Sequence, residues 1–287
     1  MTIDMITHEQ KLKSLLSRID GKVEEKYNYF HDRALLVPSR KEIISLIKDI
    51  QELMFPDYFR RSENASKSRC EILDSVFISM KRQMSAAYSF CGAGEVVDTE
   101  RLAYSILDKI PDIKDALIKD VQAIYEGDPA ARSPEEIILS YPGFYAISIY
   151  RIAHEFYLAG IPCLSRIMTE FAHEKTGIDI HAGATVGEYF FIDHGTGIVI
   201  GETTTIGNNV KIYQGVTLGA KSFELDTDGN PIKGIKRHPD IGNNCVIYAN
   251  ATILGGNTSI GDGCVIGGNV WLTHSVDPGQ VVYYNNK

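Results

Sequence analysis

The chain has 287 residues, of which 44% are hydrophobic, so it can bury a large core in one or two domains. Its net charge of −8 at pH 7 argues against nucleic acid or an anionic membrane as the main partner. The five scattered cysteines, the lack of a long apolar run and the absence of a signal-peptide pattern predict a reduced, cytoplasmic protein without disulfides.

Helical periodicity extends over the first 175 residues. In segment 41–54 the apolar residues recur three or four positions apart, as a helix with one buried face requires. The run 133–136 (Ser-Pro-Glu-Glu) is typical of a helix start, with serine as the N-cap, and the run 141–143 (Tyr-Pro-Gly) interrupts the helical pattern. Further helices are expected over 144–159 and 163–174. We therefore predict a helical domain over 1–175.

After residue 176 the apolar period changes to six. Glycine often follows each apolar anchor, and a small or β-branched residue usually stands two positions before it. The thirteen anchors are Ile180, Val186, Ile192, Ile200, Ile206, Ile212, Leu218, Ile241, Ile247, Ile253, Ile260, Ile266 and Leu272. Such hexapeptide repeats form a β-helix, in which short strands and tight turns stack an apolar interior coil on coil. The β-helix is predicted over 176–276, followed by a tail over 277–287.

Residues inside this repeat have simple packing explanations. Cys245 and Cys264 occupy small inward positions and are interpreted as core residues rather than nucleophiles. Trp271 and the pair Phe190-Phe191 are interpreted as packing or interface residues.

The repeat is interrupted at three places, and in solenoids such interruptions often bind ligands. The first lengthens the spacing of two anchors from six to eight within Asp193-His194-Gly195-Thr196-Gly197. The second is an excursion over 221–240, which contains a turn signal and ends in basic residues. A loop of this length is usually functional or disordered. The third adds one residue in the glycine-rich run 254–257.

The first interruption carries candidates for acid–base chemistry. Histidine is the usual base for a hydroxyl or amine nucleophile, and a carboxylate commonly orients it. Asp193 is adjacent to His194, but neighbouring strand side chains point to opposite faces, whereas Asp179 could approach from the preceding coil. The structural alternative is that these residues cap the turn. At the end of the excursion, Arg237 could give a carboxylate a bidentate contact.

These motifs, in this order, resemble the serine O-acetyltransferase family. The match covers 115–276, and its motifs are Asp179-Ile180-His181, the run Asp193–Thr203, Arg237-His238-Pro239 and, upstream, Asp120–Ala123, Asp128–Ala130, Gly143-Phe144 and Tyr150–His154. The repeat alone is shared with many acyltransferases, whereas the combination of motifs is more specific. The resemblance implies an α+β protein, with an N-terminal all-α domain followed by a C-terminal left-handed parallel β-helix.

It also implies direct transfer of acetyl from acetyl-CoA to the hydroxyl of L-serine, giving O-acetyl-L-serine in the first step of cysteine biosynthesis. His194 would be the general base and Asp179 its orienting partner. The implied substrate-binding residues are Asp128 and Asp193 for the ammonium group, and Arg237 and His238 for the carboxylate. Glu202, in the run Asp193–Thr203, is a further candidate for substrate binding. Holding both ends of the zwitterion presents its hydroxyl to the base.

Acetyl-CoA would lie along the coils beside the excursion, and no metal is expected. The candidate cofactor-binding residues are Gly219, Ala220, Lys221, Lys236, Gly255 and Gly267. The lysines would contact phosphates, and a backbone N–H near Gly219 would stabilise the developing oxyanion. Ala220 stands where the family commonly has glycine, and its methyl group could narrow the approach to the thioester.

The resemblance extends to partners. It implies a homotrimer or a dimer of trimers with sites between subunits, and L-cysteine as a feedback inhibitor at the serine site. Family members that bind O-acetylserine sulfhydrylase generally insert a C-terminal isoleucine into it. This chain ends in Lys287, so that complex is not expected.

Three alternatives stay open on the sequence. The nearest is another hexapeptide acetyltransferase that acts on a sugar, an antibiotic or another amine or alcohol. The second is a zinc hydratase like the γ-class carbonic anhydrases, with His181, His194 and His238 as ligands. The third is a non-catalytic scaffold, which would need neither the Asp193-His194 interruption nor the basic end of the excursion.

Overall fold

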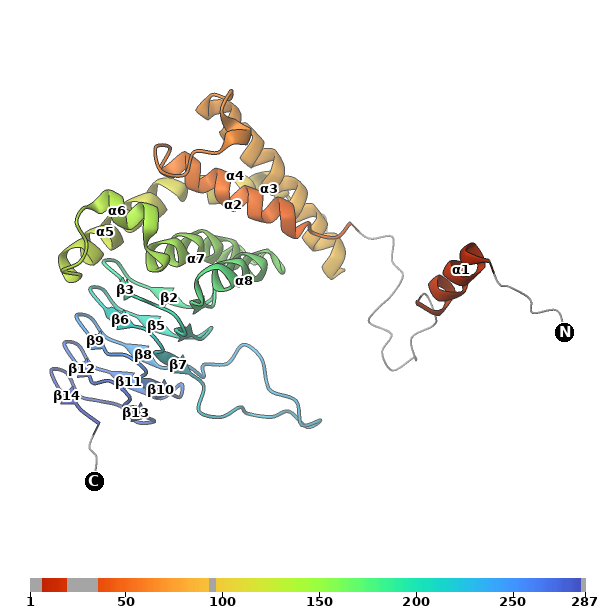
Figure 1. The fold of residues 1–287 in the computed structure, drawn as a ribbon. Helices are drawn as coiled ribbons and strands as arrows, with labels where there is room; N and C mark the ends of the chain where they lie inside the picture. The colour runs from red at the N-terminus through yellow and green to blue at the C-terminus, as the bar shows by residue number, and fades with distance from the viewer. Residues whose placement is uncertain (1–6, 20–35, 93–96, 285–287) are drawn as a thin grey trace. The chain divides into compact units, whose positions relative to one another are not determined.

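A computed structural model describes residues 7–19, 36–92 and 97–284 (Figure 1). The chain divides at residue 35 into two compact units. In the first unit, helix α1 (His8–Ile19) has no buried residues. The other helices and all described strands belong to the second unit. Lys287, on which the expectation about O-acetylserine sulfhydrylase depends, lies outside the described residues.

The predicted helices are confirmed, with boundaries shifted by one or two residues. The helices of the second unit are α2 (Arg40–Met54), α3 (Arg69–Cys91), α4 (Thr99–Leu107), α5 (Ile110–Gly127), α6 (Pro134–Ser140), α7 (Pro142–Leu158) and α8 (Leu164–Thr176), with a 3-10 turn, η2 (Ser62–Asn64). Ser133 caps α6 as predicted, because its Oγ accepts a hydrogen bond from the Glu136 N–H at 3.2 Å. Tyr141 separates α6 from α7. None of the described helices combines the length and apolarity needed to cross a lipid bilayer.

The second half of the chain is a parallel β-solenoid with three sheets. Sheet A consists of β1 (Asp179–Ile180), β4 (Val199–Ile200), β7 (Thr217–Gly219), β10 (Thr252–Leu254) and β13 (Trp271–Leu272). Sheet B consists of β2 (Thr185–Val186), β5 (Thr205–Ile206), β8 (Asp240–Ile241) and β11 (Ser259–Ile260). Sheet C consists of β3 (Phe191–Asp193), β6 (Lys211–Tyr213), β9 (Val246–Ile247), β12 (Val265–Ile266) and β14 (Val281–Val282).

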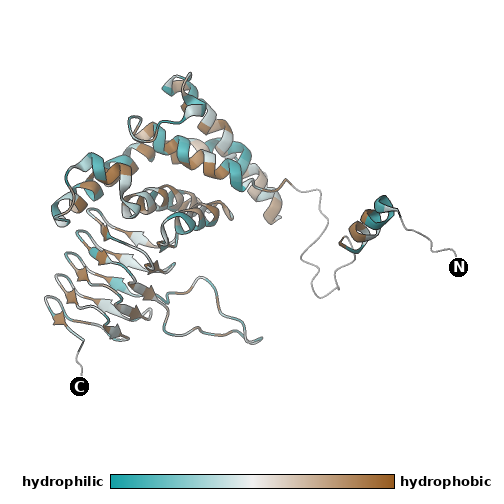
Figure 2. Ribbon diagram, viewed as in Figure 1, coloured by the Kyte–Doolittle hydropathy of each residue, from teal (hydrophilic) through white to brown (hydrophobic). Residues whose placement is uncertain are grey.

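The apolar anchors stack in register inside the solenoid. On sheet A, Ile180, Ile200, Leu218, Ile253 and Leu272 are paired strand to strand. All anchors except Val186 are buried, as are Cys245, Cys264 and the Phe190-Phe191 pair. Trp271 is exposed. Figure 2 shows apolar residues recurring in coil after coil. The predicted helical region followed by a parallel β-solenoid is therefore confirmed.

Helices cover the first coil of the solenoid, where α5, α7 and α8 contact β1 and β3 (Figure 1). A buried ion pair fixes this junction. Arg151 on α7 donates to both carboxylate oxygens of Asp120 on α5, at 2.7 and 2.9 Å. Arg151 also donates to the Gly187 carbonyl at 2.8 Å, and Asp120 accepts from the Phe190 N–H at 2.9 Å. Because residues 36–287 form one compact unit, the division into separate domains at residue 175 stays a prediction.

The excursion leaves the solenoid after β7 and returns at β8 (Figure 1). An antiparallel bridge pairs Leu225 with Pro231. Between them, the Asp226 carboxylate accepts hydrogen bonds from the N–H groups of Asp228 and Asn230, both at 2.9 Å. The predicted turn is thus present, and the basic end of the excursion is carried back to the second coil.

Candidate active site

The Asp193-His194 interruption forms a long turn between sheets C and A. Asp193 pairs with Tyr213 and Val199 with Thr217, so this turn holds five residues where the next coil holds three. His194 adopts a φ of 54° and Gly195 a φ of 85°. A Cβ at residue 195 would lie 2.4 Å from the Ile178 side chain, so glycine is required there. The turn leaves the His194 side chain 70% exposed, facing away from the core.

The acidic residues meet at this turn. Asp128, at the C-terminal end of α5, accepts a hydrogen bond from the Tyr141 hydroxyl at 2.7 Å. That bond raises the pKa of Tyr141 to about 12, and burial, Glu136 and Asp193 raise it in the same direction. Burial also raises the pKa of Tyr213, together with the charges of Asp193 and Asp128. Asp128, Tyr141, Asp193, His194 and Tyr213 thus gather at one corner of the solenoid, which we call the acidic corner.

The structure places the two candidate partners of His194 differently. An oxygen of Asp193 lies 3.8 Å from His194 Nε2. Asp179 begins β1 and forms no ion pair with His194 in the described part of the chain. Its charge acts instead on His181, two residues along. The pairing of Asp179 with His194 stays a prediction.

A second group lies at the other end of β4, where sheet A turns into sheet B. The Glu202 carboxylate pairs with the Arg237 guanidinium at 2.5 Å and accepts a hydrogen bond from the Tyr157 hydroxyl at 3.1 Å. The Thr203 hydroxyl accepts hydrogen bonds from the backbone N–H groups of Arg237 and His238, at 3.0 and 3.1 Å. The basic corner is defined as Tyr157, His181, Glu202, Thr203, Arg237 and His238.

Both histidines of the basic corner are held neutral. Burial and then the Arg237 charge lower the pKa of His238 to about 4, and burial also lowers the pKa of His181. His238 Nδ1 accepts the Thr203 N–H at 3.1 Å, so its hydrogen is on Nε2. The ring packs directly on Gly201, where a Cβ would come within 2.1 Å of it. His238 can therefore donate a hydrogen bond to a ligand without being charged.

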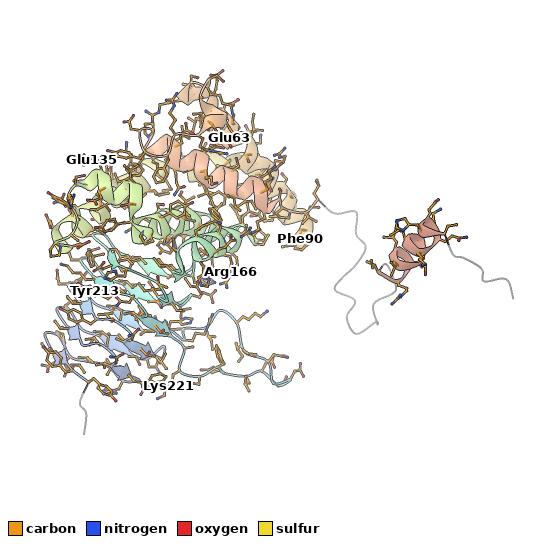
Figure 3. The ribbon with its side chains drawn as sticks, in the orientation of Figure 1. Glu63, Phe90, Glu135, Arg166, Tyr213 and Lys221 are labelled. Carbon is orange, nitrogen blue, oxygen red and sulfur yellow. The ribbon has the colours of Figure 1, made fainter. Side chains whose placement is uncertain are left out.

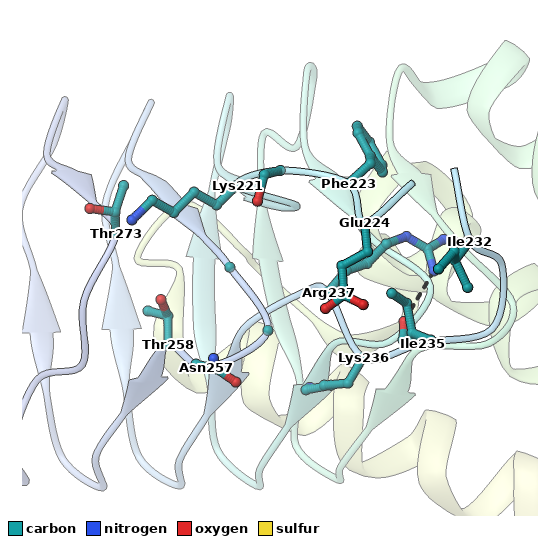
Figure 4. Close-up of a pocket in the computed structure, with 13 residues that line it drawn as sticks. Lys221, Phe223, Glu224, Ile232, Ile235, Lys236, Arg237, Asn257, Thr258 and Thr273 are labelled. Atoms are coloured by element: carbon teal, nitrogen blue, oxygen red, sulfur yellow. Dashed lines mark hydrogen bonds between the residues drawn. The ribbon is translucent and has the colours of Figure 1, made fainter. Parts of the chain in front are cut away.

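A cavity of about 260 Å³ lies between the excursion and the later coils (Figure 4). Its lining includes three predicted cofactor residues, Lys221, Lys236 and Gly255. Figure 4 shows Lys221 extended along the coils toward Thr273. Lys236 contacts Asp240 and the Thr203 carbonyl, both at 2.5 Å.

The other predicted cofactor residues lie outside this lining. Gly219 ends β7, and its carbonyl accepts the Gly255 N–H at 3.0 Å, so it borders the cavity. Ala220 is half-buried between Gly219 and Lys221. Gly267 follows β12 on sheet C and packs against Tyr283, and the structure does not bring it to the cavity.

Three tyrosines of the two corners, Tyr141, Tyr157 and Tyr213, are not predicted as site residues from the sequence. Tyr141 is part of the predicted helix break, and Tyr157 and Tyr213 belong to no recognised motif. Tyr150, His154 and Tyr157 do share one face of α7 by their spacing. That spacing gives no indication that Tyr157 reaches Glu202, which is 45 residues away in the sequence.

The three histidines of the zinc alternative are divided between the two corners. His194 lies in the acidic corner, and His181 and His238 lie in the basic one. Across residues 7–19, 36–92 and 97–284, no three His, Cys, Asp or Glu side chains are grouped so as to hold a metal ion.

Comparison with known proteins gives consistent results. A family model described as "Serine acetyltransferase, N-terminal" matches residues 94–148. A plasmid serine acetyltransferase of Synechococcus elongatus is 42% identical over 270 residues, covering 89% of this chain and 84% of that protein. The crystal structure of serine acetyltransferase isoform 3 from Entamoeba histolytica, in complex with cysteine, has a TM-score of 0.72 and 34% identity. The alignment covers 97% of this chain and 92% of that one. A serine acetyltransferase from Neisseria gonorrhoeae, solved with serine, has a TM-score of 0.56 and 31% identity, over 82% of this chain and 93% of that one.

Proposed function

This chain belongs to the serine acetyltransferase family, an acyltransferase family of cysteine biosynthesis, and from that membership we propose a mechanism and a site for it. Acetyl passes directly from acetyl-CoA to the hydroxyl of L-serine, with His194 as the general base. The observation that carries this proposal is the exposed His194 on its lengthened turn, beside the Asp193 carboxylate and in the corner that Asp128 joins through Tyr141.

The reaction needs one base and one leaving group. His194 removes the proton of the serine hydroxyl as the oxygen attacks the thioester carbonyl carbon. The C–S bond then breaks, and the CoA thiolate takes the proton from the imidazolium. The products are O-acetyl-L-serine and free CoA. Asp179 would orient His194 once its carboxylate turns toward the ring, and the N–H groups near Gly219 would stabilise the oxyanion.

The two corners match the two ends of a zwitterion. The acidic corner supplies Asp128 and Asp193 for the ammonium group, and the basic corner supplies Arg237 and the neutral Nε2–H of His238 for the carboxylate. Both groups of serine are attached to one carbon atom, whereas the corners lie at opposite ends of β4. We therefore propose that the acidic corner of one copy faces the basic corner of another in a homotrimer, which can pair further into a dimer of trimers.

The cavity beside the excursion suits CoA. Lys221 reaches along it and has no hydrogen bond or ion pair among the described residues, so its ammonium group is available to a phosphate. Lys236 would have to leave Asp240 to do the same.

L-cysteine differs from L-serine only in the thiol, so we propose that it competes at the same site. The relative crystallised with cysteine supports this.

One assay tests the mechanism. Purified protein with acetyl-CoA and L-serine is expected to release free thiol, and His194→Ala is expected to lower kcat by about 10²–10⁴, because general-base catalysis contributes that much. His173→Ala, on the exposed end of α8, is the matched control and should keep wild-type activity. Thiol release that is independent of serine, or that survives His194→Ala, would contradict the mechanism. Homoserine and amino sugars as acceptors, and added L-cysteine, test the substrate and inhibitor assignments.

A further inference from the structure

The Arg237 guanidinium already has a carboxylate partner in this structure. Arg237 Nη2 lies 2.5 Å from Glu202 Oε2, and both side chains are only 21% exposed. Building on the proposed function, we propose that Glu202 and Tyr157 are positioning residues. Glu202 orients Arg237 for the substrate carboxylate, Tyr157 orients Glu202, and neither touches the substrate.

Both oxygens of the Glu202 carboxylate are engaged by protein donors. The Tyr157 hydroxyl donates to Oε1 at 3.1 Å, and Arg237 donates to Oε2. Burial raises the pKa of Glu202, but the hydrogen bonds from Arg237 and Tyr157 outweigh it and lower the pKa overall. Glu202 is therefore ionised at neutral pH, and its charge is directed to Arg237 rather than to a substrate ammonium.

Tyr157 is itself held in place by its surroundings. It lies in the last turn of α7, and its ring meets that of His181 edge-on, at 5.9 Å between centroids and 83°. A Cβ at residue 183 would lie 2.7 Å from Tyr157 Cζ and 3.0 Å from Glu202 Cγ, so Gly183 leaves the space that both side chains use. The chain of contacts thus runs from α7 through the first two coils to the end of the excursion.

This arrangement leaves Arg237 able to bind a ligand. A guanidinium has five N–H donors, and Glu202 accepts a hydrogen bond from Nη2 alone. Among the residues that the structure describes, the guanidinium donates one further hydrogen bond, a long one of 3.4 Å from Nη1 to the Ile235 carbonyl (Figure 4). A long side chain that is already ordered loses less entropy when the ligand binds. The role of Glu202 and Tyr157 should therefore appear in the KM for serine and not in kcat.

The first test is a split between KM and kcat. Tyr157→Phe removes only the hydroxyl and is expected to raise the KM for serine about threefold, and Glu202→Ala about tenfold, with kcat retained. Glu202→Gln keeps an acceptor oxygen and should fall between the wild type and Glu202→Ala. In the Glu202→Ala background, Tyr157→Phe should have no further effect, because it acts through Glu202. Tyr104→Phe, an exposed tyrosine on α4, is the matched control for losing one hydroxyl.

The second test separates positioning from direct contact. L-Serinamide lacks the carboxylate, so Glu202→Ala and Arg237→Ala should not raise the KM when serinamide is the acceptor. If serinamide turns over too slowly, its inhibition constant against serine is measured instead and should be the same in the variants and the wild type. A penalty that persists with serinamide would mean that Glu202 binds the ammonium group and would overturn the proposal. A lower KM for serine in Glu202→Ala would overturn the proposal too, as would an unchanged KM for serine in both Glu202→Ala and Tyr157→Phe. Failure of the wild type to acetylate serine would instead contradict the proposed function.

Discussion

At the scale of single residues, neutrality is the notable property of the basic corner. His238 is 7% exposed, and its pKa is lowered from 6.5 to about 4 by burial and by Arg237. A charged His238 would add to the attraction for a carboxylate, but it would have to be buried beside Arg237. A neutral His238 keeps one directed N–H donor, and with a pKa of about 4 its protonation state does not change across the physiological pH range.

This neutrality predicts an acid-sensitive stability. Below pH 6.5 the unfolded chain protonates its histidine, whereas the folded chain does not until about pH 4. Stability is therefore retained above 6.5 and lost as the pH falls toward 4, by at most about 1.4 kcal/mol per pH unit for this group. His238→Asn keeps an acceptor for the Thr203 N–H but cannot titrate. Its melting temperature should fall less between pH 7.5 and 5 than that of the wild type. An equal fall in both proteins would refute the assignment, and His173→Asn is the exposed control.

Residue-scale predictions from the sequence succeeded where the signal was local. Ser133 as a cap depends on residues within one turn of helix, and the lengthened turn at His194 follows from a count between anchors. The Tyr157–Glu202–Arg237 contacts join α7, the second coil and the excursion. No sequence periodicity predicts these contacts, because they depend on how the helices pack on the first coil.

At the scale of elements, the Asp120–Arg151 pair joins helices to solenoid. Asp120 belongs to one of the upstream motifs by which the chain resembles its family. The structure gives Asp120 a structural role as well, because it is fully buried and bonded to Arg151 and to the Phe190 N–H. A buried carboxylate of this kind needs its partner, since an unpaired buried charge is costly.

Arg151→Met is expected to destabilise the protein by about 3–5 kcal/mol, because it leaves Asp120 buried without its counter-ion. Asn at position 120 can still accept the Phe190 N–H, so the Asp120→Asn/Arg151→Met double variant should be more stable than Arg151→Met alone. Thermal melting of both variants measures this. A double variant that melts below the single variant would contradict the charge argument. Arg166→Met, at an exposed i,i+4 pair on α8, should change stability little.

Element-scale prediction was most reliable in the solenoid. Anchors six residues apart return to the same face in every coil, so a sequence period becomes a stack of side chains. Val186 is the exception, since it is only partly buried and lines a small cavity with Tyr150 and His154 of α7. Ile180 and Ile192 of the same first coil are buried as the repeat predicts, so the exception is confined to the position beside this cavity.

At the scale of the whole molecule, the acidic and basic corners are the two halves of one proposed site. Figure 3 labels Tyr213 of the acidic corner and Lys221, where the excursion begins, on the solenoid. The family resemblance implies sites between subunits, and the placement of the two corners supports that proposal. One chain presents them at opposite ends of β4, so under this proposal a single serine is bound by two copies of the chain.

Mixed assemblies test this directly. Asp193→Ala disables the acidic corner and Arg237→Ala the basic one, so each variant alone should lose most activity. If the two chains are co-expressed in equal amounts and mix at random in trimers, about one quarter of the interfaces combine two intact corners. Activity should therefore recover to about a quarter of wild type. A site within one chain predicts no recovery, because every chain then carries a lesion.

The matched control places both lesions in the same corner. Asp128 and Asp193 belong to the same corner, since both raise the pKa of Tyr141 and of Tyr213. A mixture of Asp128→Ala chains and Asp193→Ala chains therefore contains no intact acidic corner. Their co-expression should leave the activity at the level of the single variants. Recovery in this control would mean that the two aspartates serve different subunits' sites. Mass measurements on the purified mixtures establish that the chains have exchanged, and mixed trimers without recovery in the first experiment would confine the site to one chain.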